Sequence, residues 1–194
     1  MTANLTGIDG DGIIRDSIER SDGYLRLLQV SPKVLEKYIK IAGEEQDSID
    51  TIQILAGDDT LKEVMDDFIV SSEASDLIKN GKLEILSTGE DLQRSVVIVG
   101  ESSVMSYIDL GDSIGALSSD DDTLVDEATS LFSSLWESGD DFKIRTPPIT
   151  DVKTTLRDEI GEETQEDFTG MLDILETAKG DGEGLDEITV ALLA

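Results

Sequence analysis

The stretch from Ser95 to Trp136 limits the possible fold more than any other part of this sequence. Three short apolar runs are separated by glycine-containing turns, a pattern that predicts three strands with tight connections. The runs are Val96–Val99, Val104–Ile108 and Ile114–Leu117. From Asp120 to Trp136 the apolar residues recur at helical spacing and form one wide face, which Gly139 can terminate. We therefore expect an antiparallel meander followed by a helix.

Strands and helices alternate before this stretch. The predicted strands are Tyr24–Val30, Thr51–Leu55 and Leu83–Leu86. Helical patterns cover Ile8–Arg20 after a frayed start, begin again at Ser31-Pro32, and run from Asp58-Asp59 to Asn80-Gly81. Because strand–helix–strand order produces crossovers between parallel strands, these three strands are expected to be parallel and the next three antiparallel. The predicted fold class is α/β: a mixed sheet flanked by helices, followed by a helical extension.

The sequence changes character at Thr146-Pro147-Pro148, a stiff segment typical of a domain edge. Amphipathic helices are predicted at Val152–Ile160 and Phe168–Ala178. A glycine-rich joint then leads to the apolar helix Leu185–Ala194, which we interpret as the first element of a truncated module. The expected domains are the mixed-sheet domain over residues 1–146, a helical extension over 147–179, and the joint and last helix over 180–194.

The charge of the chain is extreme. Aspartate and glutamate number 44 against 15 lysines and arginines, and the net charge is -29. Like charges oppose compaction, and molar salt shortens the Debye length to about 3 Å. The composition therefore favours a halophilic protein over a mesophilic one that binds a basic partner. Cysteine and histidine are absent, and no apolar stretch is long enough to span a membrane. We expect a soluble, cytoplasmic protein with no membrane partner.

No motif derived from residue spacing specifies a catalytic or metal site. Asp9-Gly10-Asp11-Gly12 and Asp181-Gly182-Glu183-Gly184 lack the spacing of a calcium loop, and we interpret both as polar turns. Asp120-Asp121-Asp122 is interpreted as a helix N-cap, and Trp136 as a core residue. We therefore assign no catalytic residue, no metal ligand and no cofactor, and cofactor-binding residues are not identified.

Four stretches carry a family resemblance. They are DDFIVSSEASDLIKNGKLEIL (Asp66–Leu86), LFSSLWE (Leu131–Glu137), FKIRTPPITDVKTTL (Phe142–Leu156) and ETAKGDGEGLDEITVALLA (Glu176–Ala194). With the meander, they resemble the haloarchaeal transcriptional regulators of the TbsP family over essentially the whole chain. In that family a winged helix-turn-helix follows where this chain ends. The resemblance implies that the DNA-reading part, with every DNA-contact residue, lies beyond Ala194.

A second resemblance concerns architecture. The order of elements, and RSVVIVGESSVMSYI running on to a helix that ends in LWE, is similar to the phospholipase D-like domains that also serve as sensors in TrmB-type regulators. The catalytic version needs His-x-Lys, then four residues, then Asp, with histidine as the phosphoryl-accepting nucleophile. The corresponding positions here hold Gln93, Ser95 and Gly100. The implied domain is therefore not an enzyme.

The implied function is that of the sensor and dimerisation region of a DNA-binding regulator of metabolic genes. The implied partners are a second copy of the chain, a possible small-molecule effector, and DNA through a C-terminal module absent from this chain. Winged-helix regulators usually act as two-fold dimers because their operators are two-fold. Two alternatives stay open at this point: a stand-alone non-catalytic ligand-binding module, and an acidic adaptor for a basic partner.

Overall fold

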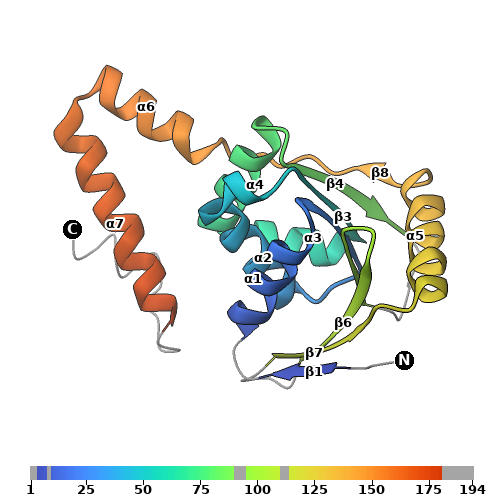
Figure 1. Ribbon diagram of the computed structural model, residues 1–194. Helices are drawn as coiled ribbons and strands as arrows, with labels where there is room; N and C mark the ends of the chain where they lie inside the picture. The colour runs from blue at the N-terminus through green and yellow to red at the C-terminus, as the bar shows by residue number, and fades with distance from the viewer. Residues whose placement is uncertain (1–3, 8–9, 90–94, 110–113, 181–194) are drawn as a thin grey trace. The chain divides into compact units, whose positions relative to one another are not determined.

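The computed structural model describes residues 4–7, 10–89, 95–109 and 114–180 (Figure 1). The chain divides into two compact units, Met1–Thr146 and Pro147–Ala194, which we call the N-terminal and C-terminal units. Each unit is described by itself below.

The N-terminal unit is built on one mixed sheet of eight strands, in the order β1-β7-β6-β5-β2-β3-β4-β8. The strands are β1 (Asn4–Gly7), β2 (Tyr24–Leu28), β3 (Thr51–Gly57), β4 (Leu83–Thr88), β5 (Val96–Val99), β6 (Ser103–Asp109), β7 (Ile114–Ser119) and β8 (Asp140–Asp141). Strands β2, β3 and β4 are parallel, and every other neighbouring pair is antiparallel. The predicted fold class, with three parallel strands and an antiparallel meander, is confirmed.

Helices lie on both faces of this sheet (Figure 1). The helical elements are α1 (Gly10–Arg20), α2 (Pro32–Glu44), the 3-10 turn η1 (Gln46–Ser48), α3 (Asp58–Met65), α4 (Phe68–Lys79) and α5 (Asp122–Trp136). Helices α1 to α4 bury their apolar faces in one large cluster on one side of the sheet. Helix α5 packs on the opposite side. Its cluster contains Leu28, Leu55, Ile98, Val104, Val125, Phe132 and Leu135.

Local sequence signals set the starts of the helices. The Ser31 side chain accepts a hydrogen bond from the backbone N–H of Val34 at 3.4 Å, and Pro32 occupies the first turn of α2. Asp67 caps α4 in the same way. The Asp121 side chain accepts from the N–H of Leu124 at 3.2 Å and caps α5, as the sequence predicts. These caps satisfy amide groups that a helix leaves without partners.

A chain of hydroxyl groups runs through the main core. The Ser17 Oγ lies 2.7 Å from the phenol oxygen of Tyr38, and that oxygen lies 2.7 Å from the phenol oxygen of Tyr107. The two rings meet edge to face with centroids 6.0 Å apart. Tyr38 is fully buried, and burial raises the pKa of its phenol well above the usual value near 10. The chain thereby joins α1, α2 and β6 through neutral hydroxyls.

The C-terminal unit contains α6 (Ile149–Glu159) and α7 (Glu162–Gly180), joined by a turn. Gly161 in that turn has φ 135°, a left-handed conformation that favours glycine. No side chain between residues 147 and 175 is buried, although α6 and α7 carry apolar stripes. The two predicted helices are thus present and pack against each other, but this packing leaves Ile160, Met171 and Ile174 exposed among the described residues.

The structure differs from the sequence-based expectation at four places. The N-terminus was expected to fray, yet residues 4–7 form β1, which pairs with β7. Strand β8 consists of two aspartates and joins β4 through its own backbone groups, to which the Ser87 hydroxyl also donates, so no apolar pattern predicts it. Strand β2 ends before Val30 because Gln29 adopts a left-handed conformation with φ 49°. Residues Gly10 to Gly12 begin α1 and do not form the expected turn. Asp9 and the sequence Asp181–Gly184 lie outside the described residues.

Candidate functional site

The positions that match the phospholipase D motif lie around β5. Ser95 immediately precedes the strand, and Gly100 immediately follows it, so the two residues stand at opposite ends of β5. The Ser95 hydroxyl is buried and has no hydrogen-bond partner among the described residues. Gln93 lies outside the described residues. A serine hydroxyl without an adjacent base is a weak nucleophile.

Gly100 is fixed by its backbone. Its φ is 58°, and its N–H donates to the carbonyl of Tyr24 at 2.9 Å. A Cβ at this position would lie 2.9 Å from the carbonyl oxygen of Ser21, a backbone atom that cannot move away cheaply. The aspartate of the catalytic motif therefore cannot be placed here without shifting the start of β2. The geometry does not support phosphodiester chemistry at this end of the strand.

Within the described ranges, no group of three or more acidic, histidine or cysteine side chains is placed to hold a metal ion. No helix in the same ranges is long and apolar enough to cross a membrane.

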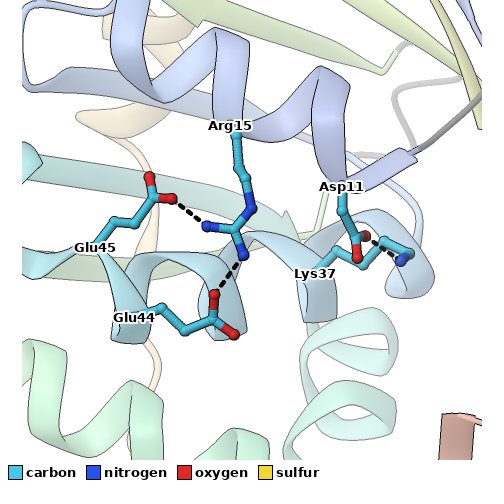
Figure 2. Close-up of polar contacts among 5 residues, drawn as sticks. All are labelled: Asp11, Arg15, Lys37, Glu44 and Glu45. Atoms are coloured by element: carbon cyan, nitrogen blue, oxygen red, sulfur yellow. Dashed lines mark hydrogen bonds and ion pairs between the residues drawn. The ribbon is translucent and has the colours of Figure 1, made fainter.

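An ion-pair cluster joins α1 to α2 (Figure 2). The Arg15 guanidinium reaches both Glu44 and Glu45, and the Lys37 ammonium pairs with Asp11. Hydrogen bonds to Glu44 and then Glu45 raise the pKa of Arg15, which stays charged. A surface cavity of about 340 Å³ beside this cluster is lined by four cations, but three carboxylates share it. Water and salt screen exposed pairs of this kind, and Arg15, Lys37 and Lys40 already have carboxylate partners.

A second surface cavity has a different charge balance. We call it the basic groove. It has a volume of about 430 Å³ and is lined by Lys62, Met65, Asp66, Phe142, Lys143, Ile144, Arg145 and Thr146. Three lysine or arginine side chains face one aspartate among the described residues that line it, and all of these residues belong to the N-terminal unit. The basic groove is the better candidate for binding an anion.

The wall of the basic groove at residues 142–146 is held in place. The Ser71 hydroxyl donates to the Thr146 Oγ1 at 2.9 Å, and the Ser75 hydroxyl donates to the Thr146 carbonyl at 2.7 Å. Phe142 and Ile144 pack against the main core, whereas the intervening Lys143 and the following Arg145 are exposed. The alternation of an extended segment therefore turns both cations outward.

The cations of the chain differ in their partners. Ion pairs with carboxylates hold Arg15, Arg20, Lys37, Lys40, Lys62 and Arg157. In contrast, the side chains of Lys143, Arg145 and Lys153 make no ion pair or hydrogen bond within the described residues. Sequence analysis did not single out these three residues. The available signal was the stretch from residue 143 to residue 157, which has four basic residues and one acid in a strongly acidic chain.

Helices α6 and α7 are acidic overall. Residues 147–180 contain nine carboxylates and three basic side chains, which leaves a charge of -6. Five carboxylates lie in the first half of α7 or just before it, from Glu159 to Asp167. An acidic helix start is unsuited to reading base edges, for which arginine, asparagine or glutamine is typical.

Two family models match the chain side by side. The model "Transcriptional regulator TbsP-like, N-terminal" matches residues 2–147, and "Transcriptional regulator TbsP-like, C-terminal HTH domain" matches residues 148–194. A protein with an N-terminal domain and a C-terminal helix-turn-helix (HTH) domain is a DNA-binding regulator in its class. The chain belongs to the TbsP-like transcriptional regulators. No curated protein sequence matches it.

The second match corrects one expectation. The DNA-binding module was expected to lie beyond Ala194 except for its first helix at Leu185–Ala194, with residues 147–179 as a separate helical extension. The HTH family model begins at residue 148, so α6 and α7 belong to the matched HTH region. The expectation rested on the apolar pattern of Leu185–Ala194, which was interpreted as the first element of a truncated module. The match favours the regulator over a stand-alone ligand-binding module or an acidic adaptor.

Solved structures share the fold of the N-terminal unit at low sequence identity. NucT from Helicobacter pylori is 14% identical with a TM-score of 0.53, over 73% of this chain and 99% of that chain. Nuc from Salmonella typhimurium, a phospholipase D family member, is 12% identical with a TM-score of 0.50, over 73% and 98%. TrmBL2, an archaeal chromatin protein, is 18% identical with a TM-score of 0.50 over 73% of this chain. This chain spans 54% of TrmBL2. The predicted phospholipase D-like architecture is confirmed as a fold.

Proposed function

We propose that this protein regulates transcription by binding DNA through its C-terminal unit, and that its N-terminal unit is a non-catalytic domain that senses an effector. One observation carries the proposal: a TbsP-like N-terminal match and an HTH match adjoin each other at residues 147 and 148. TrmBL2, which shares the fold, is described as a chromatin protein with a novel mode of DNA binding.

The absence of catalysis follows from residue chemistry in the motif. The chain has no histidine, so the phosphoryl-accepting nucleophile of phospholipase D-like enzymes is missing. Gly100 has a left-handed backbone with no space for a Cβ. A fold that keeps its sheet but loses the reactive groups is suited to binding without turnover. Function belongs to sites placed on a fold and does not follow from the fold alone.

Self-association through α6 and α7 forms part of the proposal. Ile160 and Ile174 are exposed by 66% and 57%, and Met171 is also exposed. Apolar stripes on a helix must be covered to be stable in water, by the same unit or by a second chain. Two-fold operators require two-fold dimers. The proposed assembly is a homodimer to which these helices contribute.

The proposed setting is the salt-rich cytoplasm of a halophilic archaeon, with metabolic genes as targets. The net charge of -29 supports the first part, because repulsion among 44 carboxylates is screened in molar salt. The resemblance to haloarchaeal TbsP regulators supports metabolic genes as the targets. A small-molecule effector is proposed for the N-terminal unit, with no binding residue assigned.

A mobility-shift comparison at matched KCl tests the function. Residues 1–194 and residues 1–146 are each incubated with sheared genomic DNA from the source organism. We expect retardation by residues 1–194 and none by residues 1–146, because the HTH match lies in the second unit. Equal retardation by both proteins, or by neither, would contradict the assignment of DNA binding to the C-terminal unit.

A further inference from the structure

The uneven pairing of cations points to an external anion. In this chain carboxylates outnumber basic residues by 44 to 15. Six lysines and arginines pair with carboxylates in the ion pairs described above. Among the described residues Lys143 and Arg145 form no such pair, although Asp66 lies in the same groove and Asp140 and Asp141 precede them. Both side chains are exposed and available to an anion from outside the protein.

The backbone places these two cations in register. Residues 143 and 145 are on the same side of an extended segment, so their Cα atoms stand roughly 7 Å apart at the strand rise of about 3.3 Å per residue. Thr146 anchors the segment to α4 through Ser71 and Ser75, and Phe142 and Ile144 anchor it to the core. The segment that carries the two charges is thus attached to the N-terminal unit by Phe142 and Ile144 and by Thr146.

Position in the sequence favours DNA as the anion. Arg145 is three residues before the HTH match begins at residue 148. Double-stranded DNA attracts proteins mainly through lysine and arginine side chains that replace counterions on phosphates. Helices α6 and α7 contribute few such groups, because acids outnumber bases by nine to three between residues 147 and 180. An acidic HTH region therefore needs cations from outside its own helices.

We infer that Lys143 and Arg145, on the outer wall of the basic groove, bind backbone phosphates of the DNA that the HTH region recognises. This inference rests on the proposed DNA-binding function and names residues for it that lie in the N-terminal unit. Such contacts position the protein on the duplex and carry no sequence information. They also place DNA contact next to Thr146, where the two units join.

The salt dependence of DNA affinity tests this inference. The logarithm of the association constant falls linearly with the logarithm of salt concentration, with a slope of about -0.9 for each phosphate neutralised. The double variant Lys143→Gln/Arg145→Gln is therefore expected to have a slope less steep by about 2. The charge-preserving variant Lys143→Arg/Arg145→Lys is expected to keep the slope of the unmodified chain, because phosphate contacts respond to charge.

A matched control removes two cations that already have partners. Arg20→Gln/Lys40→Gln changes the net charge by the same amount and removes the pairs with Asp16 and Glu36. Its salt slope is expected to match that of the unmodified chain. Circular dichroism before each titration confirms that every variant is folded, which is expected because all substituted side chains lie at the surface.

Three results would overturn the inference. An unchanged salt slope in the double variant would show that Lys143 and Arg145 do not bind backbone phosphates. If the control variant changes the salt slope by the same amount as the double variant, DNA affinity depends only on the net charge of the protein. If the double variant keeps the salt slope of DNA binding but no longer binds inorganic phosphate, the basic groove binds a small anion and not DNA. If the unmodified chain fails to bind any DNA, the proposed function fails first, and this inference fails with it.

Discussion

The N-terminal and C-terminal units solve the burial of apolar side chains differently. The N-terminal unit encloses two clusters, one on each face of its sheet, and several large side chains in it are completely buried. In the C-terminal unit no side chain from residue 147 to residue 175 is buried. Helices α1 and α6 have nearly the same amphipathic pattern, yet α1 buries three isoleucines and α6 buries no residue, so the pattern alone does not create a core.

The charge of the two units follows the same division. Residues 1–146 contain 31 acidic and 12 basic residues, a charge of -19, whereas residues 147–194 contain 13 acidic and 3 basic residues, a charge of -10. The shorter unit carries more charge per residue and has less buried apolar surface among its described residues. Under the proposed function, we expect its stability to depend more on salt and on a second chain than that of the N-terminal unit does.

The largest expected effect comes from removing a core aromatic residue. Phe132 is 1% exposed and stacks on Trp136 with ring centroids 5.3 Å apart. Phe132→Ala should lower the free energy of unfolding of the N-terminal unit by about 3–5 kcal/mol. Urea unfolding in molar KCl, followed by the fluorescence of the single tryptophan and by circular dichroism, measures it. The matched change Phe168→Ala, at a half-buried position on α7, should leave the urea unfolding transition reported by Trp136 fluorescence unchanged. If both variants lost the same free energy of unfolding, the two units would not differ in how their apolar side chains stabilise them.

Salt should separate the two units next. Because screening removes repulsion among the 44 carboxylates, the thermal midpoint should rise by on the order of 10 °C between about 0.1 M and 2 M KCl, or roughly 3 kcal/mol. Helical signal from the C-terminal unit should be lost at higher salt than the Trp136 signal. A midpoint that is flat or falls with added KCl would argue against the halophilic interpretation, and simultaneous loss of both signals would argue against the separation.

Self-association provides a smaller test of the same contrast. Light scattering in molar KCl should give about twice the 21.0 kDa mass of the monomer at tens of micromolar. Ile174→Glu should weaken the dimer at least tenfold, or about 1.4 kcal/mol, because a charge would be buried at an apolar interface. Ile78→Glu changes a 39% exposed residue on α4 and should leave the dimer intact. A dimer disrupted only by the α4 change would move the interface to the N-terminal unit.

The smallest effect concerns the buried hydroxyl chain. Burial favours the neutral phenol of Tyr38, so its pKa is higher in the folded state than the value near 10 in the unfolded chain. Its contribution to stability is therefore fully present below about pH 10 and declines as the pH rises toward the folded-state pKa. Tyr38→Phe should cost about 1 kcal/mol at pH 8 and reduce the loss of stability above pH 10. Tyr24→Phe, at an exposed position, is the control. An unchanged alkaline transition in Tyr38→Phe would refute this role.

Sequence periodicity predicted most of the fold. The meander from Val96 to Ser119 and α5 carry strong patterns of period two and period 3.6, and the structure contains them at the expected places. The helix caps at Ser31 and Asp121 were also predicted from the sequence, because their side chains accept hydrogen bonds from backbone N–H groups three residues away. Strands β1 and β8 were not, since their pairing depends on backbone groups of distant strands and not on their own side chains.

The candidate site was less predictable. The loss of phospholipase D chemistry follows from composition, because the chain contains no histidine. The basic groove depends on distance in space: Lys62 comes from α3, while Lys143 and Arg145 come from a segment about eighty residues later. Which cations have carboxylate partners also requires the tertiary structure. Arg15 pairs with Glu44 and Glu45, which lie 29 and 30 residues away.

The sequence by itself determined the order of the elements, the acidity of the protein and the absence of a histidine nucleophile. These properties arise from residue types and from spacing within one turn or one strand. Only the tertiary structure decided that α5 occupies a different face from α1 to α4, that Gly100 has no room for a side chain, and that Lys143 and Arg145 have no carboxylate partner among the described residues. The reason is physical: packing, steric clash and ion pairing depend on groups that folding brings together from distant parts of the chain.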